Sequence, residues 1–135
     1  MAQFIFTDGY LLINAVNMSA MAKKITLKTS AAEHVTTTFG STYESRIAGM
    51  KDYSLDLEFN QDMAATAVDG LLFPLLGTVS TFEVRATSAA ASTTNPAYRG
   101  SVLINDYAPL DGAQGDLAQT GASWPGTGTL LRQTT

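Results

Sequence analysis

Apolar and polar residues alternate most clearly between Tyr53 and Asn60, where the odd positions are apolar and the even positions are polar. A period of two is typical of a β-strand with one buried face. The pattern therefore predicts a strand whose open face carries Ser54, Asp56 and Glu58.

Residues 81–87 repeat this alternation, which predicts a second strand that turns Glu83 and Arg85 toward solvent. Further strands are predicted from apolar or alternating stretches at about 10–16, 24–29, 35–39, 98–107 and 116–124.

One α-helix is predicted over about 62–73, because Asp62 can cap its first turn and apolar residues follow at three- and four-residue steps. Residues 41–50 mix glycine, serine and charged residues, and we expect a long loop or an extended hairpin arm there. Residues 126–135 are predicted to form a polar, glycine-rich tail, with 130–131 as the candidate for a short final strand.

No internal repeat or shift in composition marks a domain boundary, so residues 1–135 are predicted to form one domain. Several strands, one helix and several more strands follow one another. This order predicts an antiparallel β-sandwich or open barrel with one flanking α-helix.

Charged residues are scarce for a domain of this size. They make up 15% of the 135 residues, against about 25% in a typical soluble domain. A monomer usually covers itself in charge, so a surface of small uncharged residues is typical of a protein that other subunits cover. The alternative is a monomer of modest solubility with a bland surface.

The balance of charge also limits the partners. A net charge of −4 argues against tight binding to nucleic-acid phosphates, which requires clustered Lys and Arg.

The apolar run at 71–76 is far shorter than the roughly 20 residues of a membrane span, so no membrane partner is expected. No secretory signal is visible near the N-terminus, and the absence of Cys suits folding in a reducing cytoplasm.

Residue types that catalysis and metal binding need are missing or isolated. The chain has no Cys and one His, His34, with no nucleophile motif around it. A hydrolytic triad needs a base beside its nucleophile, and a lone His makes a poor metal site. The sequence therefore predicts no catalytic residue, no metal site and no cofactor, in a protein that is not an enzyme.

Asp56 and Glu58 together predict an acidic, wet strand face. If copies of the chain form a closed ring, this face could line a channel, because like charge on the wall keeps DNA from sticking. The alternative is a plain sheet face turned to solvent.

Several segments, in the right order, resemble the tail tube proteins (major tail proteins) of long-tailed bacteriophages. The resemblance covers roughly residues 20–132. Its segments are GMKDYSLDLEFNQD at 49–62, LFPLLG at 72–77, FEVR at 82–85, NPAYRG at 95–100, GDL at 115–117 and WP at 124–125.

The resemblance implies a structural virion protein that assembles with itself into stacked hexameric rings. In such a tube, sheets from six copies join into one inner barrel, and the helix packs outside it. The lumen holds the tape-measure protein and later passes DNA without reading its sequence. The tail is built with other tail proteins in the cytoplasm of the host bacterium.

Residue roles follow from the resemblance by position. The channel-lining candidates are Asp56, Glu58, Glu83 and Arg85. The candidates for contacts between rings lie in the loop and are Ser41, Thr42, Tyr43, Glu44, Arg46 and Met50.

Two alternative functions remain open at this point. A tail terminator or distal tail protein of related fold would show the same pattern. A monomeric β-sandwich that binds a ligand, for instance a sugar, would usually show clustered exposed aromatics. This chain has one Trp, and its aromatic residues lie mostly at inward strand positions.

Overall fold

The computed structural model describes residues 3–135, and β-strands make up most of it. In chain order the elements are β1 (Tyr10–Ile13), β2 (Val16–Asn17), β3 (Ala22–Val35), β4 (Arg46–Asn60), α1 (Val68–Leu72), the 3₁₀ turn η1 (Phe73–Leu75), β5 (Val79–Arg85), β6 (Ala97–Leu103) and β7 (Gln119–Gln133). This mostly-β architecture with one short α-helix confirms the predicted fold class.

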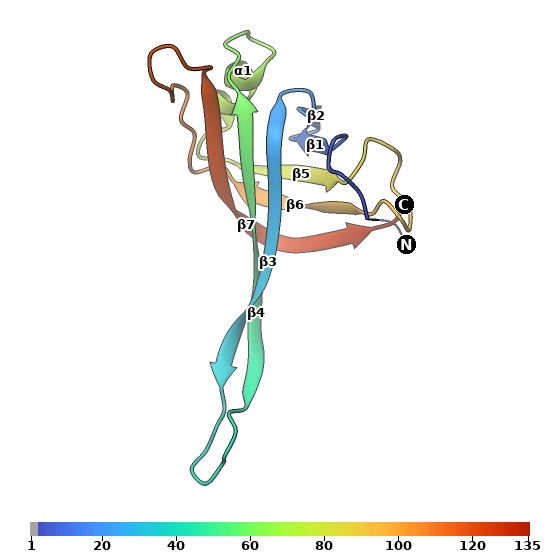
Figure 1. Cartoon of the computed structure of the whole chain (residues 1–135), viewed down its shortest axis with the longest axis vertical. Coiled ribbons are helices and arrows are strands. Elements are labelled where there is room, and N and C mark those ends of the chain that lie inside the picture. The colour runs from blue at the N-terminus through green and yellow to red at the C-terminus, as the bar shows by residue number, and fades with distance from the viewer. Residues whose placement is uncertain (1–2) are drawn as a thin grey trace.

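The seven strands form one open antiparallel sheet in the order β2–β1–β5–β6–β7–β4–β3. Strand β7 changes partner along its length, because residues 119–125 pair with β4 and residues 126–133 pair with β6. The sheet therefore bends along β7 into two half-sheets whose strands run in different directions (Figure 1). We call them the arm half-sheet (β3, β4 and the first part of β7) and the body half-sheet (β1, β2, β5, β6 and the second part of β7).

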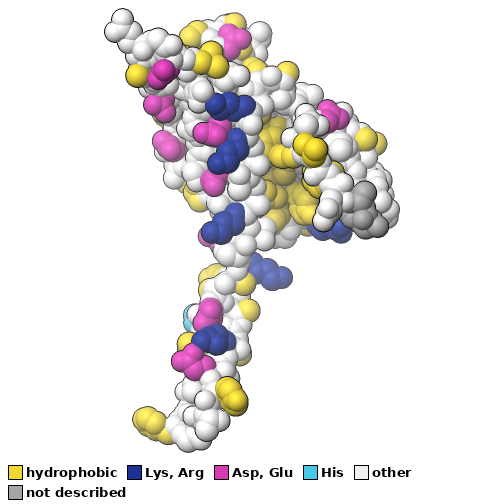
Figure 2. All heavy atoms as spheres, viewed as in Figure 1, with side chains coloured by type: hydrophobic (Ala, Val, Ile, Leu, Met, Phe, Trp, Pro, Cys, Tyr) yellow, Lys and Arg dark blue, Asp and Glu magenta, His cyan; other side chains and the backbone are white. Residues whose placement is uncertain are grey.

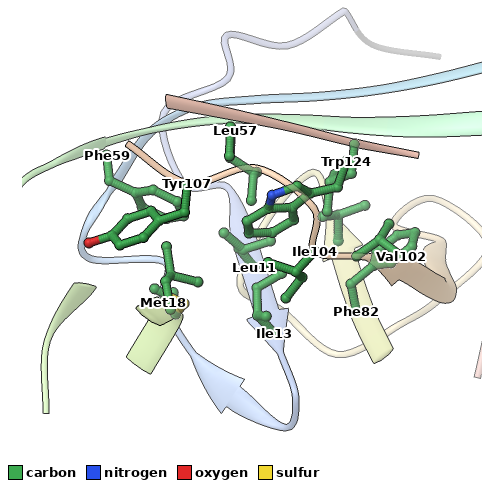
Figure 3. Packing of buried hydrophobic residues seen from close by; sticks show 14 of the residues in the cluster. Leu11, Ile13, Met18, Leu57, Phe59, Phe82, Val102, Ile104, Tyr107 and Trp124 are labelled. Carbon is green, nitrogen blue, oxygen red and sulfur yellow. The ribbon is translucent and has the colours of Figure 1, made fainter. Parts of the chain in front are cut away.

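The hydrophobic core fills the space between the half-sheets (Figure 3). Along β4 the odd positions over 53–59 are buried, as the alternation predicted, and Phe82 and Val84 of β5 are buried from the other side. Trp124 of β7 is fully buried, and its indole N–H donates a hydrogen bond to the carbonyl of Asp106 at 2.8 Å. This bond satisfies the buried indole and fastens the loop after β6 over the core.

Tyr53 connects three strands where β7 changes partner. Its hydroxyl oxygen lies 2.9 Å from the carbonyl oxygens of Ser101 and Thr127, and it accepts a hydrogen bond from the Ser101 N–H at 3.2 Å. The Tyr53 ring covers Gly126, where an added Cβ would lie 2.3 Å from a ring carbon. Gly126 is therefore required by this close approach, since any side chain there would collide with the ring.

Helix α1 is tied to the loop after β6 by a chain of polar contacts. The Tyr107 hydroxyl donates a hydrogen bond to the Asp69 carboxylate at 2.8 Å and accepts one from the Gln61 amide at 3.1 Å. Burial raises the pKa of Tyr107 above its ordinary value, because the phenolate would lose hydration. The hydroxyl therefore stays protonated and remains a donor to the helix.

The predicted helix is wrong at its start, because α1 begins only at Val68. The Asp62 carboxylate accepts a hydrogen bond from the Ala64 N–H at 3.0 Å, and the Asp62 carbonyl accepts one from the Asp69 N–H at 3.1 Å. Local bonds of an Asp side chain compete with helix formation, so residues 62–67 form a loop instead.

Two strands near the N-terminus also differ from the prediction. The strand expected over 10–16 is broken by Asn14 and Ala15, whose φ angles of 52° and 63° make the two-residue turn between β1 and β2. The separate strand expected over 35–39 is absent, since β3 runs without interruption to Val35 and a loop follows.

The polar tail predicted over residues 126–135 is mostly β-strand in the structure. Residues 126–133 belong to β7 and pair with β6, whereas residues 104–107 lie outside any strand. Glycine and threonine give 126–133 little apolar alternation, so its strand state depends on a partner distant in sequence.

Replacing Gly126 by Ala should destabilise the fold by about 1–3 kcal/mol, the usual cost of overpacking, because the new methyl group collides with the Tyr53 ring. Gly112→Ala is the matched control, since a Cβ there meets no atom within 4 Å. It should change the free energy of unfolding by less than about 0.5 kcal/mol. Urea unfolding followed by circular dichroism measures both variants. Wild-type stability of Gly126→Ala would contradict the described packing.

Candidate assembly surfaces

A two-stranded hairpin projects from the body of the molecule (Figure 1). We call residues 31–51 the arm; it comprises the end of β3, the start of β4 and the loop between them. The ladder continues into it through the pair Val35 and Arg46, and the Thr36 N–H donates to the Ser45 carbonyl at 2.8 Å. Residues 41–45 thus lie in the loop and residues 46–50 in β4.

Large apolar side chains on the arm lack cover within the chain. Val35, Ile47 and Met50 are more than half exposed, and Phe39 and Tyr43 reach 108% and 87% exposure. Figure 2 shows apolar side chains at the far end of the arm. A hairpin of two strands is marginally stable alone in water, and exposed apolar patches mark interaction sites. The arm is therefore suited to packing against another protein surface.

The residues that the resemblance assigns to contacts between rings all lie on the arm with exposed side chains; they are Ser41, Thr42, Tyr43, Glu44, Arg46 and Met50. Arg46 forms ion pairs with Glu33 at 2.6 Å and with Glu44. These pairs are half exposed and add little stability, but the pair with Glu33 joins the two strands of the arm. His34 also lies on the arm, against Gly49, where an added Cβ would be 2.5 Å from its Nε2.

Asp56 and Glu58 lie half-buried on the outer face of the arm half-sheet. Glu58 is opposite Lys24 across the ladder, and Lys28 lies on the same face, opposite Ser54. Lys24 and Lys28 on the neighbouring strand therefore lie among the carboxylates of β4, and the face carries both signs of charge. Figure 2 shows basic and acidic side chains interspersed along this face.

Glu83 and Arg85 lie on the outer face of the body half-sheet in a network of ion pairs. Glu83 contacts Arg99 Nε at 2.6 Å and Arg85 Nε at 3.1 Å. The second contact lacks hydrogen-bond alignment, so Arg85 Nε has no hydrogen-bond partner within residues 3–135. The Arg85 guanidinium lies 3.8 Å from the centre of the Tyr10 ring and donates a hydrogen bond to the Ala89 carbonyl at 2.9 Å.

The structure does not bring the four channel-lining candidates together. Asp56 and Glu58 point outward from one half-sheet, and Glu83 and Arg85 point outward from the other, with the core between them. The first pair lies on an open, mixed-charge face. The second pair is largely enclosed by its own ion pairs, with side-chain exposures of 18% and 12%.

The free edge of the sheet was not identified from the sequence. Strand β3 is the outermost strand, spans 14 residues and, within residues 3–135, pairs only with β4. Its other edge presents N–H and C=O groups that a strand of another chain can pair with. The sequence feature that could have indicated this edge is the group of lysines Lys23, Lys24 and Lys28, because lysines commonly protect exposed sheet edges.

Neither a metal site nor a membrane span is found in the described part of the chain. Residues 3–135 contain no group of three or more His, Asp and Glu side chains placed to hold a metal ion. No helix in the same range is long and apolar enough to cross a membrane.

Solved structures share this fold. A chain in the virion of a native gene transfer agent particle matches with a TM-score of 0.71 at 17% identity, over 91% of this chain and 95% of that chain. A chain in the tail of an empty gene transfer agent particle with C6 symmetry matches with a TM-score of 0.66 at 15% identity, over 84% and 82%.

A third similar structure is a chain in the six-fold symmetrised baseplate of the anti-feeding prophage. It matches with a TM-score of 0.54 at 10% identity, over 97% of both chains. Neither a protein-family model nor a curated protein matches the sequence. At these identities the similarity establishes the fold.

Glu83→Gln should destabilise the fold by about 1–3 kcal/mol, because Arg85 and Arg99 would lose their shared carboxylate. Glu58→Gln is the matched control, since it makes the same change on the open face of the other half-sheet. It should cost less than about 0.5 kcal/mol. Chemical unfolding of both variants measures the difference. Equal effects would contradict the structural role of the Glu83 ion pairs.

Proposed function

We propose that the protein is a structural component of a phage-like tail, and more specifically a tail tube subunit that assembles into stacked hexameric rings. The observation that carries the proposal is the arm, whose apolar side chains have no cover within the chain. The fold supports it, because similar chains occur in a gene transfer agent tail with C6 symmetry and in a six-fold symmetrised baseplate.

The sheet supplies a route to a closed ring. Its two edges are different, since one is the 14-residue strand β3 and the other consists of β2 and β1. A contact between two different surfaces of the same chain is heterologous, and such contacts build rings when the rotation closes. Pairing along β3 would join the sheets of neighbouring copies and bury the free edge.

The arm would contact a subunit in a neighbouring ring, because it extends beyond the core of its own subunit (Figure 1). Packing its apolar side chains against a second copy would remove them from water and stabilise the two-stranded hairpin. The scarcity of charge on the chain suits such repeated contacts.

We assign the lumen to the outer face of the arm half-sheet, with Asp56 and Glu58 on its wall. Its lysines lie among carboxylates, so DNA would meet no strong net attraction there. Glu83 and Arg85 are less suited to this role, since their ion pairs enclose them. In this account the tube holds the tape-measure protein, joins other tail proteins and later passes DNA, and it is assembled in the bacterial cytoplasm.

A tail terminator, distal tail protein or baseplate component is the second candidate. The fold similarity to a baseplate chain favours it, because that similarity spans 97% of both chains. Purified protein that forms single rings or short stacks, and no long tubes, would indicate this role in place of a tube subunit.

Phe39→Ser combined with Tyr43→Ser should abolish stacking, because the exposed apolar contacts of the arm would be lost. Negative-stain microscopy at rising protein concentration should show rings or tubes for the wild type and unstacked particles for the variant. Leu110→Ser is the control, since Leu110 is also exposed, at 81%, but lies outside the arm. A wild type that stays monomeric, even with other tail proteins present, would sink the proposal.

Asp56→Lys combined with Glu58→Lys should spare folding and assembly yet impair DNA passage. The change removes two carboxylates and adds two lysines beside Lys24 and Lys28, and the resulting basic face would hold DNA phosphates. Asp111→Lys combined with Asp116→Lys makes the same charge change in an exposed loop and should have little effect. Infectivity or transfer efficiency of the particle is the readout, and normal transfer would remove the lumen assignment.

A further inference from the structure

An open apolar groove of about 490 Å³ lies along one side of the molecule, where β3 is not paired to the body half-sheet. Ile25 and Leu27 of β3 form one wall, and Val84 of β5 and Ala86, just after that strand, contribute to the other. Figure 2 shows apolar side chains gathered between the two half-sheets on this side. The groove exists because the half-sheets join at β7 and remain separate at their other edges.

The segment 3–9 partly covers this groove. Phe4 and Phe6 line it, although they remain 63% and 50% exposed. The segment forms no strand. It is held to the loop after β5 through the Asp8 carboxylate, which accepts hydrogen bonds from the Ser88 hydroxyl at 2.8 Å and the Ser88 N–H at 3.2 Å. These two bonds, the side-chain bond first, lower the pKa of Asp8 below its ordinary value.

So few contacts mark a segment that opens at low free-energy cost. The half-exposed Phe4 and Phe6 fill the groove incompletely, so a better-fitting apolar occupant would gain burial by replacing them. The cover is therefore exchangeable.

The arm of a second copy has the chemistry to occupy the groove. Its apolar side chains are uncovered, and it points away from its own body, so it cannot reach its own groove (Figure 1). Charge does not oppose this contact, because the arm carries Glu33 and Glu44 against Arg46 and Lys51, a net of zero, and the groove lining is mostly apolar.

We propose that this groove is the docking site for the arm of another copy, and that the segment 3–9 covers it until the arm arrives. The inference rests on the proposed self-assembly and deepens it by naming the surface that receives the arm. A projecting element on one copy and a recess on the next make a heterologous contact, which repeats from subunit to subunit.

Cross-linking tests the docking directly, because the chain has no Cys and each introduced thiol is unique. Thr42→Cys protein, which keeps the apolar side chains of the arm, is mixed with a size-tagged Ala86→Cys protein under conditions that give rings or tubes, and a short bismaleimide is added. We expect several-fold more heterodimer than with the control Ala113→Cys, which places the thiol in an exposed loop away from the groove.

Microscopy of the same mixtures distinguishes a failure of the docking site from a failure of the proposed self-assembly. Assembly with no excess of the Thr42–Ala86 product would overturn the docking site and leave the proposed function standing. Absence of any assembly would overturn both.

The cover is tested by Phe4→Ala combined with Phe6→Ala. This variant should assemble at a several-fold lower protein concentration, because the arm no longer competes with the two rings for the groove. Ile5→Ala is the control, since Ile5 is 85% exposed and does not line the groove. A higher threshold concentration for the double variant would contradict the role of the segment as a cover.

Discussion

Strand β7 changes partner along its length, and this change sets the shape of the molecule. Residues 119–125 pair with β4 only over Ser54–Asn60, and the strand then turns to β6. The bend brings the half-sheets face to face and creates the core. It also leaves the earlier part of β4 with β3 as its only neighbour, and this unsupported hairpin is the arm. Tyr53 and Gly126 fix the bend through a contact that a larger residue could not make.

The same bend explains the open surfaces of the molecule. Because the half-sheets meet only at β7, β3 keeps a free edge and the groove beneath it stays open. An exposed edge, an apolar groove and an apolar arm on one small chain are each unfavourable for an isolated monomer. All three become favourable when copies of the chain cover one another, and this is the physical basis of the proposed assembly.

Strand alternation was sufficient to predict the core strand over 53–60 and the inward face of β5, because burial on one face imposes a period of two. Three features did not follow from the alternation of apolar and polar residues. The strand over 126–133 requires β6, the late start of α1 reflects the local bonds of Asp62, and Lys24 lies opposite Glu58 only through strand pairing. The candidate arm residues lie together in the structure because they are neighbours in the sequence. The channel candidates come from two separate strands, and the structure places them on two different faces.

The symmetry and strand pairing of the assembled particle decide whether the chain forms rings through its free β3 edge. Electron cryo-microscopy of particles formed by the purified protein should resolve six copies per ring, with the free edge of β3 paired to a strand of the neighbouring copy. Particles of another rotational symmetry, or rings in which the β3 edge remains exposed to solvent, would contradict the account.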